Sequence, residues 1–149
     1  MDHSRKIAFD GIINARDLGG LKTADGGTIR RGCLIRSANL FQATDADTRK
    51  LREEYRLRKV IDLRTTMSVE QKPDAAMEGV EYCSMPIFND RMIGITHSND
   101  RDYARRKTMM PDMKELYRMM VTREECVAQF GAVVLTINGF FLIVPLPMG

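Results

Sequence analysis

The stretch RKVIDLRTTMSVEQKPD, residues 58–74, decides the fold class of this chain. Its apolar centre, VIDL at 60–63, is a short run of strand formers between basic residues. A charged helical pattern, with Leu51 and Tyr55 four residues apart on a narrow apolar face, leads into this strand. A helix that runs into a short buried strand is typical of a layered α/β fold. We therefore expect a central mixed or parallel sheet that is flanked by helices.

The composition is that of one globular domain. The chain has 149 residues, 44% of them apolar and 29% charged, with a formal net charge of +3. A chain of this length buries roughly 70% of its unfolded surface, which is enough for a core. Ordinary apolar content and low net charge exclude general disorder. The 3 cysteines are an odd and small number, which favours a reducing compartment, so we expect a cytoplasmic protein.

The charge and histidine patterns exclude some partners. Lys and Arg are mixed with Asp and Glu along most of the chain, whereas nucleic-acid binders concentrate their basic residues in a stripe. We therefore expect no nucleic-acid partner. His3 and His97 are far apart, and neither has a cysteine at metal-ligand spacing, so no metal is expected. Residues 1–11 lack the apolar core of a signal peptide.

Further strands and helices are predicted around residues 58–74. Residues 21–29 indicate a hairpin, because their centre has the Asp and Gly residues that tight turns need. The apolar run at 33–35 predicts a strand, and Thr44 is suited to be the N-cap of the following helix. Alternation at 80–84 predicts one more strand, which ends near Pro86.

A long loop and two helices are predicted next. Residues 89–110 are polar and weakly patterned, which is typical of a loop or lid. Pro111 is suited to the first turn of a helix. TREE at 122–125 has the pattern of a capping box, with Thr122 as the N-cap of a second helix. The expected apolar faces are Met113, Leu116, Tyr117 and Met120 on the first helix, and Val127, Phe130 and Val134 on the second.

The C-terminal stretch differs from the rest, because no charged residue follows Glu125. We divide the chain into a domain at 1–130 and an apolar tail at 131–149. Three interpretations of the tail remain open. It is a buried helix followed by a buried strand, or a membrane anchor, or a stretch read in a shifted frame. An anchor is the least favoured, because Asn138 lies near its middle and Pro145 breaks its end.

Four motifs, in this order, carry a resemblance to a known family. They are NARDLGG at 14–20, IRRGCLIRSANL at 29–40, VIDLRTTMSVEQKPD at 60–74 and MPIFND at 85–90. Together they resemble the bacterial tyrosine phosphatases of the mycobacterial phosphatase B and cyanobacterial dual-specificity type. That family has N-F-R-D-L-G-G, then R-x-G-x-L-[FY]-R-S, then D-L-R-S-x-x-E. Here Ala15 replaces the aromatic residue, and Glu70 comes later than the pattern has it.

The resemblance implies hydrolysis of phosphotyrosine in proteins, or of phosphorylated small molecules or lipids, and it implies no cofactor. In that family a cysteine in the loop H-C-x-x-G-K-D-R-[TS]-G attacks phosphorus, and an aspartate protonates the leaving group. Neither Cys33 nor Cys83 nor Cys126 has an arginine six positions later. The chain as written is therefore expected to be catalytically inactive. The alternative is a non-catalytic binding or regulatory module, in one version tethered to a membrane by its apolar end.

The resemblance also implies site residues. Asp90 is the candidate general acid, or only part of an Asn-Asp loop start. Arg16 and Asp17 resemble a family pair that lies under the active site, or they form an ion pair that ties the N-terminal segment to the sheet. Asp62 and Arg64 follow the strand at its C-terminal edge, where ligands bind in open α/β sheets. They support the phosphate loop, line the substrate cleft, or are a solvated strand end.

The codons of the tail permit part of the missing loop. Residues 144–149 require GTN-CCN-(CTN or TTR)-CCN-ATG-GGN. With CTN at Leu146, reading one base later permits Phe-His-Cys-(Pro or Gln)-Trp-Gly, which matches the beginning of the family loop. We therefore expect a frameshift between about 126 and 140, which would also account for the loss of charge.

Overall fold

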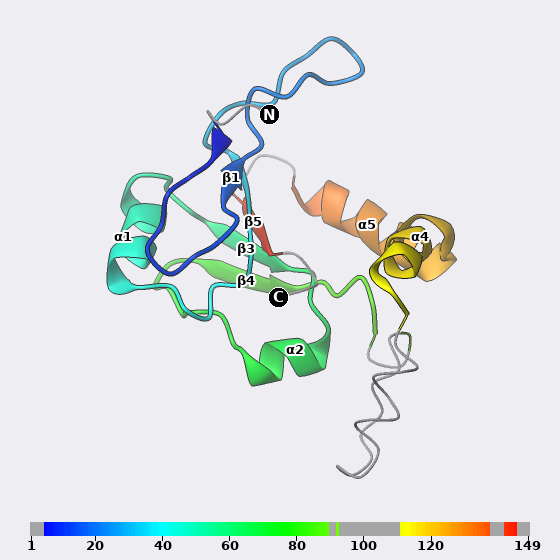
Figure 1. The fold of residues 1–149 in the computed structure, drawn as a ribbon. Coiled ribbons are helices and arrows are strands. Elements are labelled where there is room, and N and C mark those ends of the chain that lie inside the picture. Colours follow the sequence, from blue (N-terminus) through cyan, green and yellow to red (C-terminus); the bar gives the residue numbers. More distant parts are fainter. Residues whose placement is uncertain (1–4, 90–91, 93–110, 138–141, 146–149) are drawn as a thin grey trace.

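The structure is a computed structural model that describes residues 5–89, 92, 111–137 and 142–145. Its centre is a five-stranded sheet in the order β1-β2-β5-β3-β4, with helices on both sides (Figure 1). The strands are β1 (Arg16–Asp17), β2 (Leu34–Ser37), β3 (Lys59–Asp62), β4 (Glu81–Ser84) and β5 (Leu142–Pro145). β1 is antiparallel to β2, and the other neighbouring strands are parallel. The predicted mixed α/β sheet is confirmed.

One face of the sheet, here called the α1 face, packs against α1 (Asp45–Glu53), and the short α2 (Thr66–Gln71) follows β3 without burying a residue. Thr44 is the N-cap of α1, as predicted, and it forms a capping box with Asp47. The Asp47 carboxylate also accepts hydrogen bonds from the backbone of Asp10 and Gly11, which joins the N-terminal segment to α1. The buried core of this face comprises Ile7, Ile12, Ala15, Ile35, Leu40, Leu51, Leu57 and Val60.

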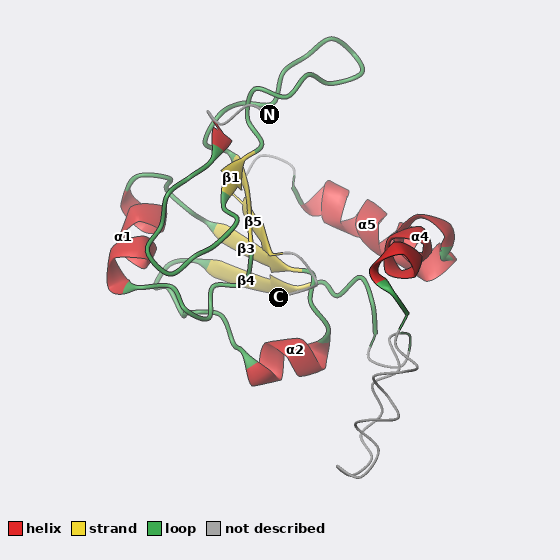
Figure 2. Ribbon diagram, in the orientation of Figure 1, coloured by secondary structure: helices red, strands yellow, loops and turns green. Residues whose placement is uncertain are grey.

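The opposite face, here called the α5 face, is covered by α4 (Met113–Thr122) and α5 (Glu124–Thr136) (Figure 2). Neighbouring residues of a strand point to opposite faces, so Val60 packs on the α1 face and Ile61 on the α5 face. The buried core of the α5 face comprises Ile61, Leu63, Ile87, Phe88, Leu116, Met119, Cys126 and Val133.

Helix α4 begins later and packs differently than predicted. Its N-cap is Asp112, which accepts a hydrogen bond from the Glu115 backbone at 2.8 Å, so Pro111 precedes the helix. Leu116 is buried as expected, but Tyr117 is 59% exposed. Tyr117 is one residue and therefore about a quarter turn away from Leu116, outside the narrow face that reaches the sheet.

The capping-box prediction for the second helix is also wrong. Thr122 is the last residue of α4, and its hydroxyl donates to the Arg118 carbonyl oxygen at 2.8 Å. Arg123 is the N-cap of α5 and makes no side-chain capping hydrogen bond. Helix α5 buries Cys126 and leaves Val134 67% exposed, because the turn between the helices rotates its apolar face away from the predicted one.

The hairpin at 21–29 is confirmed by an antiparallel bridge between Lys22 and Thr28. At its tip, Gly26 has a φ of +85°, which glycine adopts without strain.

Two elements involve the C-terminal stretch. Helix α5 continues through position 131, and β5 pairs with both β2 and β3 in the middle of the sheet. A helix followed by a strand is thus what the described part of this stretch forms. None of the helices within the described ranges has the length and apolar character needed to cross a membrane.

Candidate functional site

The candidate site lies where the parallel strands end together. In the sheet register Ser37 of β2 lies beside Pro145 of β5, and Asp62 of β3 lies beside Ser84 of β4. The carboxyl ends of the four parallel strands therefore form one edge. In open α/β sheets ligands bind outside this edge, and the buried charged residues Asp62 and Arg64 lie there.

Asp62 and Arg64 form a buried ion pair at this edge. Asp62 is 0% exposed and Arg64 is 2% exposed. The Arg64 Nη2 and Nε atoms lie 2.6 and 2.9 Å from the two Asp62 carboxylate oxygens, and the Arg64 backbone N–H donates to Asp62 Oδ1 at 3.0 Å. This two-pronged geometry is the strong form of an arginine–carboxylate contact, and it fixes the chain as it leaves β3.

A second carboxylate, Asp74, joins the pair from the segment after α2. Its Oδ1 lies 3.0 Å from Arg64 Nη2 and accepts a hydrogen bond from the Leu40 backbone at 2.7 Å. Arg64 Nη1 also donates to the Lys72 carbonyl oxygen at 2.7 Å. Arg64 therefore links the segment after β3 to the segment after α2, and Asp74 extends this link to the segment after β2.

Tyr82 completes this buried network by donating its hydroxyl to Asp62 Oδ2. Burial tends to raise the pKa of Asp62, but hydrogen bonds from Arg64 and Tyr82 lower it below its usual value. Burial raises the pKa of Asp74 despite the hydrogen bond from Leu40 and the nearby Arg64 charge. Burial and Asp62 raise the pKa of the Tyr82 hydroxyl, which is therefore a donor at neutral pH.

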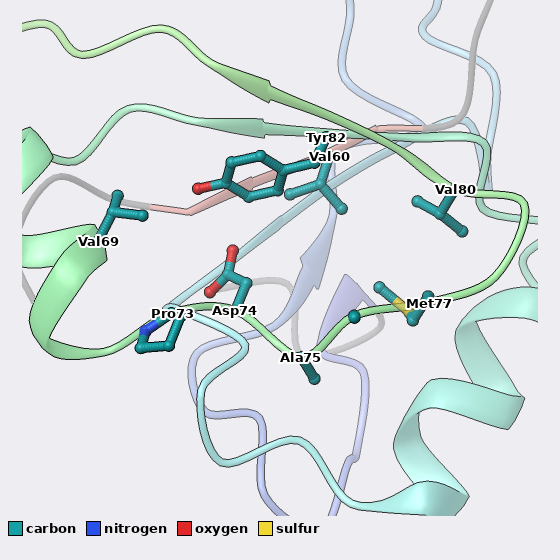
Figure 3. A pocket seen from close by; sticks show the side chains of 9 residues that line it. Val60, Val69, Pro73, Asp74, Ala75, Met77, Val80 and Tyr82 are labelled. Carbon is teal, nitrogen blue, oxygen red and sulfur yellow. The ribbon is translucent and has the colours of Figure 1, made fainter.

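The network leaves one polar atom without a partner. The Asp74 side chain is 3% exposed, and its Oδ2 atom is buried without a hydrogen bond to any residue that the structure describes. Asp74 and Tyr82 project toward the same mostly apolar pocket of about 280 Å³ (Figure 3). The pocket is lined by Val60, Val69, Pro73, Asp74, Ala75, Ala76, Met77, Val80 and Tyr82.

The structure brings the predicted Asp62 and Arg64 together and contradicts one interpretation of them. They are not a solvated strand end, because both side chains are almost fully buried. The physical reason is mutual neutralisation: a buried ion pair tolerates burial when its remaining polar atoms are hydrogen-bonded. Support of a phosphate loop by Asp62 and Arg64 stays a prediction.

Arg16 and Asp17 do not form the ion pair that one interpretation gave them. Asp17 Oδ1 accepts a hydrogen bond from the Gly19 backbone at 2.8 Å, and Asp17 Oδ2 accepts one from the Gly32 backbone at 2.9 Å. Arg16 is exposed. The two residues are neighbours on an extended strand, so their side chains point to opposite faces. Asp17 closes the base of the hairpin, and Arg16 lies away from it.

The candidate acid Asp90 lies outside the described residues. Among the cysteines, Cys126 is fully buried and directs its thiol to the Ile87 carbonyl oxygen at 3.3 Å. Burial raises the pKa of Cys126. Burial and the Glu81 carboxylate raise the pKa of Cys83. Both thiols therefore stay protonated at neutral pH, unlike a cysteine nucleophile.

Sequence reasoning missed Asp74 and Tyr82 as members of the network. A weak signal was present for Tyr82, which lies beside Val60 on the neighbouring parallel strand and so shares a face with Asp62. Asp74 has no such periodic signal, because it lies in an irregular segment that only the fold brings to Arg64.

A sheet of mainly parallel strands with helices on both faces defines a protein of the α/β class. The sequence model of the tyrosine phosphatase family matches residues 7–142. Since this range spans most of the chain, the chain belongs to the tyrosine phosphatase family, as the sequence motifs indicated.

A curated protein of Cupriavidus necator, named "Putative tyrosine-protein phosphatase", is similar to part of this chain. The two are 42% identical over 76 residues, which is 51% of this chain and 27% of the relative. The chain thus spans about a quarter of the length of that relative.

Proposed function

We propose that the intact protein that this sequence represents hydrolyses phosphate monoesters. Phosphotyrosine in proteins is the proposed substrate class, with phosphorylated small molecules or lipids as further members. The observation that carries this proposal is the family match over residues 7–142. The common carboxyl edge of β2, β5, β3 and β4 supports it, because a phosphate loop after β5 would lie in the position that such sheets use for ligands.

In the proposed reaction a cysteine thiolate attacks phosphorus, and the bond from phosphorus to the phenolic oxygen breaks. An aspartic acid, with Asp90 as the candidate, gives its proton to that oxygen. Water then attacks the phosphocysteine and releases phosphate and the thiolate. Asp62 and Arg64 are proposed to act as support, because their buried pair fixes the chain where it leaves β3.

We propose that the 149-residue chain does not itself carry out this reaction. The raised pKa values of Cys83 and Cys126 support this, because the reaction needs a thiolate. Residue six after Cys33 is Asn39, so this cysteine also lacks the arginine of the family loop.

The test is release of phosphate from para-nitrophenyl phosphate by the purified chain. We expect a rate equal to that of the buffer blank. The triple variant Cys33→Ser, Cys83→Ser and Cys126→Ser is the control. Activity that is present in the wild type and abolished in this variant would overturn the proposal of inactivity while leaving the family reaction in place.

We further propose that the tail is read in a shifted frame from a point between about 126 and 140. In the alternate frame the permitted Phe-His-Cys occupies codons 144–146, and β5 ends at Pro145. The cysteine would then directly follow the central strand, at the carboxyl edge of the sheet. Sequencing the DNA from codon 120 onward tests this: one inserted or deleted base should restore H-C-x-x-G-K-D-R, and the proposal fails if every frame lacks it.

The second candidate function is a non-catalytic binding or regulatory module. The protonated thiol of Cys126 supports the absence of catalysis. The pocket beside Asp74, whose Oδ2 atom has no hydrogen bond among the described residues, supports binding. The three free cysteines support placing either version in the cytoplasm. Recovery of the tagged chain in the membrane fraction would instead favour the tethered version of this module.

A further inference from the structure

A row of three basic residues crosses the β1 side of the sheet. Lys6 forms an antiparallel bridge with Arg16, and Arg16 is paired with Arg36 across β1 and β2. Residues directly opposite each other in antiparallel strands share a face, and their Cβ atoms are about 5 Å apart. Lys6, Arg16 and Arg36, here called the basic row, therefore place three positive charges side by side.

The basic row lies on the α5 face, outside the packed core. Ile35 packs on the α1 face and Leu34 packs against the core of the α5 face. Arg36 is two residues from Leu34 and one from Ile35, so it shares the face of Leu34. Lys6 and Arg16 are exposed, and Arg36 is partly exposed.

No carboxylate neutralises the basic row within the described ranges of the chain. The adjacent Asp17 is directed to the opposite face and is occupied by the backbone of Gly19 and Gly32. In addition, the Nε atom of Arg36 is buried and has no hydrogen-bond partner. Like charges opposite each other destabilise a sheet, and an unpaired buried donor does so too. A bound anion would remove the repulsion directly, and a turn of the Arg36 side chain toward the anion would also give its Nε atom an acceptor.

We propose that the basic row is a binding site for a phosphate group. Guanidinium groups match the oxygens of phosphate in geometry, and a dianion would offset most of the three charges. Two strand spacings of about 4.8 Å separate Lys6 from Arg36, so long side chains can converge on one group. Arg36 is paired with Val144 of β5, which places the site beside the central strand. The proposal does not rest on the proposed function, because binding of phosphate to the basic row requires no step of the hydrolysis reaction.

The primary test is a titration of the ¹⁵N-labelled full chain with inorganic phosphate, followed by NMR. We expect the Nε–Hε resonance of Arg36 to shift and saturate at millimolar phosphate, because this donor gains an acceptor. The matching resonance of Arg118, an exposed arginine paired with Glu115 on α4, should stay in place. Chloride at equal ionic strength should move neither resonance.

Variants separate the site from general charge effects. Arg16→Gln should weaken phosphate binding about tenfold, the effect expected for loss of one charge-assisted hydrogen bond. Arg118→Gln is the matched control and should bind as the wild type does. Arg36→Lys keeps the charge but removes the Nε donor, so it should bind more weakly than the wild type while keeping the backbone spectrum.

Three outcomes would overturn the proposal. One is an Arg36 resonance that does not respond to phosphate, or responds equally to chloride. Another is unchanged affinity in Arg16→Gln. A third is a single-stranded oligonucleotide that binds far more tightly than phosphate with a steep salt dependence, which would make the basic row a nucleic-acid contact. Equal binding of phosphate and O-phosphotyrosine would support the site and show that the free group is sufficient.

Discussion

The two faces of the sheet treat their charges in opposite ways. On the α1 face, Arg64 is 2% exposed and is paired with two buried carboxylates, Asp62 and Asp74. On the α5 face, Arg16 and Arg36 lie opposite each other with no ion pair among the described residues, and one Arg36 nitrogen is orphaned. The charges of the buried network are neutralised by ion pairs within the protein. The charges of the basic row are not, so they can interact with a ligand.

This difference indicates which charges maintain the fold and which are available to a ligand. Arg64 contacts Asp62 at the end of β3 and the segment after α2, and Asp74 in that segment accepts from Leu40 after β2. We therefore expect the loss of the Arg64 charge to destabilise the whole domain. The basic row contributes repulsion in the empty protein, so the loss of one of its charges should be tolerated. Stability measurements on matched variants test this difference between the two faces.

The largest effect is expected for Arg64→Met. It keeps much of the side-chain volume but leaves two buried carboxylates without their cation, which typically costs about 3–5 kcal/mol. Urea unfolding followed by circular dichroism measures the loss. The exposed Arg118→Met is the control and should change the free energy of unfolding by less than about 0.5 kcal/mol. A similar small change for Arg64→Met would mean that the network does not maintain the fold.

Asp62→Asn and Asp74→Asn should have the next largest effects, with opposite pH trends. The pKa of Asp62 is lowered from 3.8, so its contribution is present above 3.8 and is lost as pH falls through the folded-state pKa. The pKa of Asp74 is raised from 3.8, so its contribution is complete below 3.8 and is lost as pH rises through the folded-state pKa.

At neutral pH we therefore expect Asp62→Asn to cost about 3 kcal/mol, because Arg64 loses its main partner. Asp74→Asn should cost only about 1 kcal/mol, since the amide oxygen can still accept from Leu40. On acidification toward 3.8 the loss in Asp74→Asn should grow. Unfolding curves at a series of pH values test this, and parallel profiles for the two variants would refute the assignment of opposite shifts.

Tyr82→Phe is expected to cost about 1 kcal/mol, the typical value of one hydrogen bond to a buried group. It removes the donor to Asp62 Oδ2 and keeps the ring that lines the pocket. The matched control is Tyr117→Phe on α4, whose side chain is largely exposed and should be neutral. Equal midpoints of urea unfolding for both variants would show that the Tyr82 hydroxyl adds no stability.

The local elements of the fold could be predicted where one pattern dominates. The apolar run at 60–63 predicted a strand that the structure has at Lys59–Asp62, and capping chemistry predicted the N-cap Thr44. Helix faces near the C-terminal end were less predictable, because the turn at Arg123 sets the rotation of α5. The residues around Thr122 are compatible with a capping box and also with the last turn of a helix. Only tertiary packing decides between these two positions.

The candidate site was predictable only in part, because some of its contacts join residues that are far apart in the sequence. Asp62 and Arg64 are two residues apart and end a strand, so their pairing has a local cause. Asp74 reaches Arg64 through an irregular segment, and the basic row unites positions ten and twenty residues apart through strand register. Such contacts depend on the topology, which no local spacing in the sequence contains.

The smallest effect, and the one of opposite sign, is expected for Arg16→Gln. Removing the central charge of the basic row relieves repulsion toward Lys6 and Arg36, so stability should rise by roughly 0.2–1 kcal/mol at low salt. Thermal unfolding at low ionic strength measures the gain, which should shrink in high salt as the charges are screened. Phosphate should reverse the order, because it stabilises only the protein that binds it. If Arg16→Gln lowers the midpoint at low salt, Arg16 has a stabilising partner and the comparison between the two faces fails.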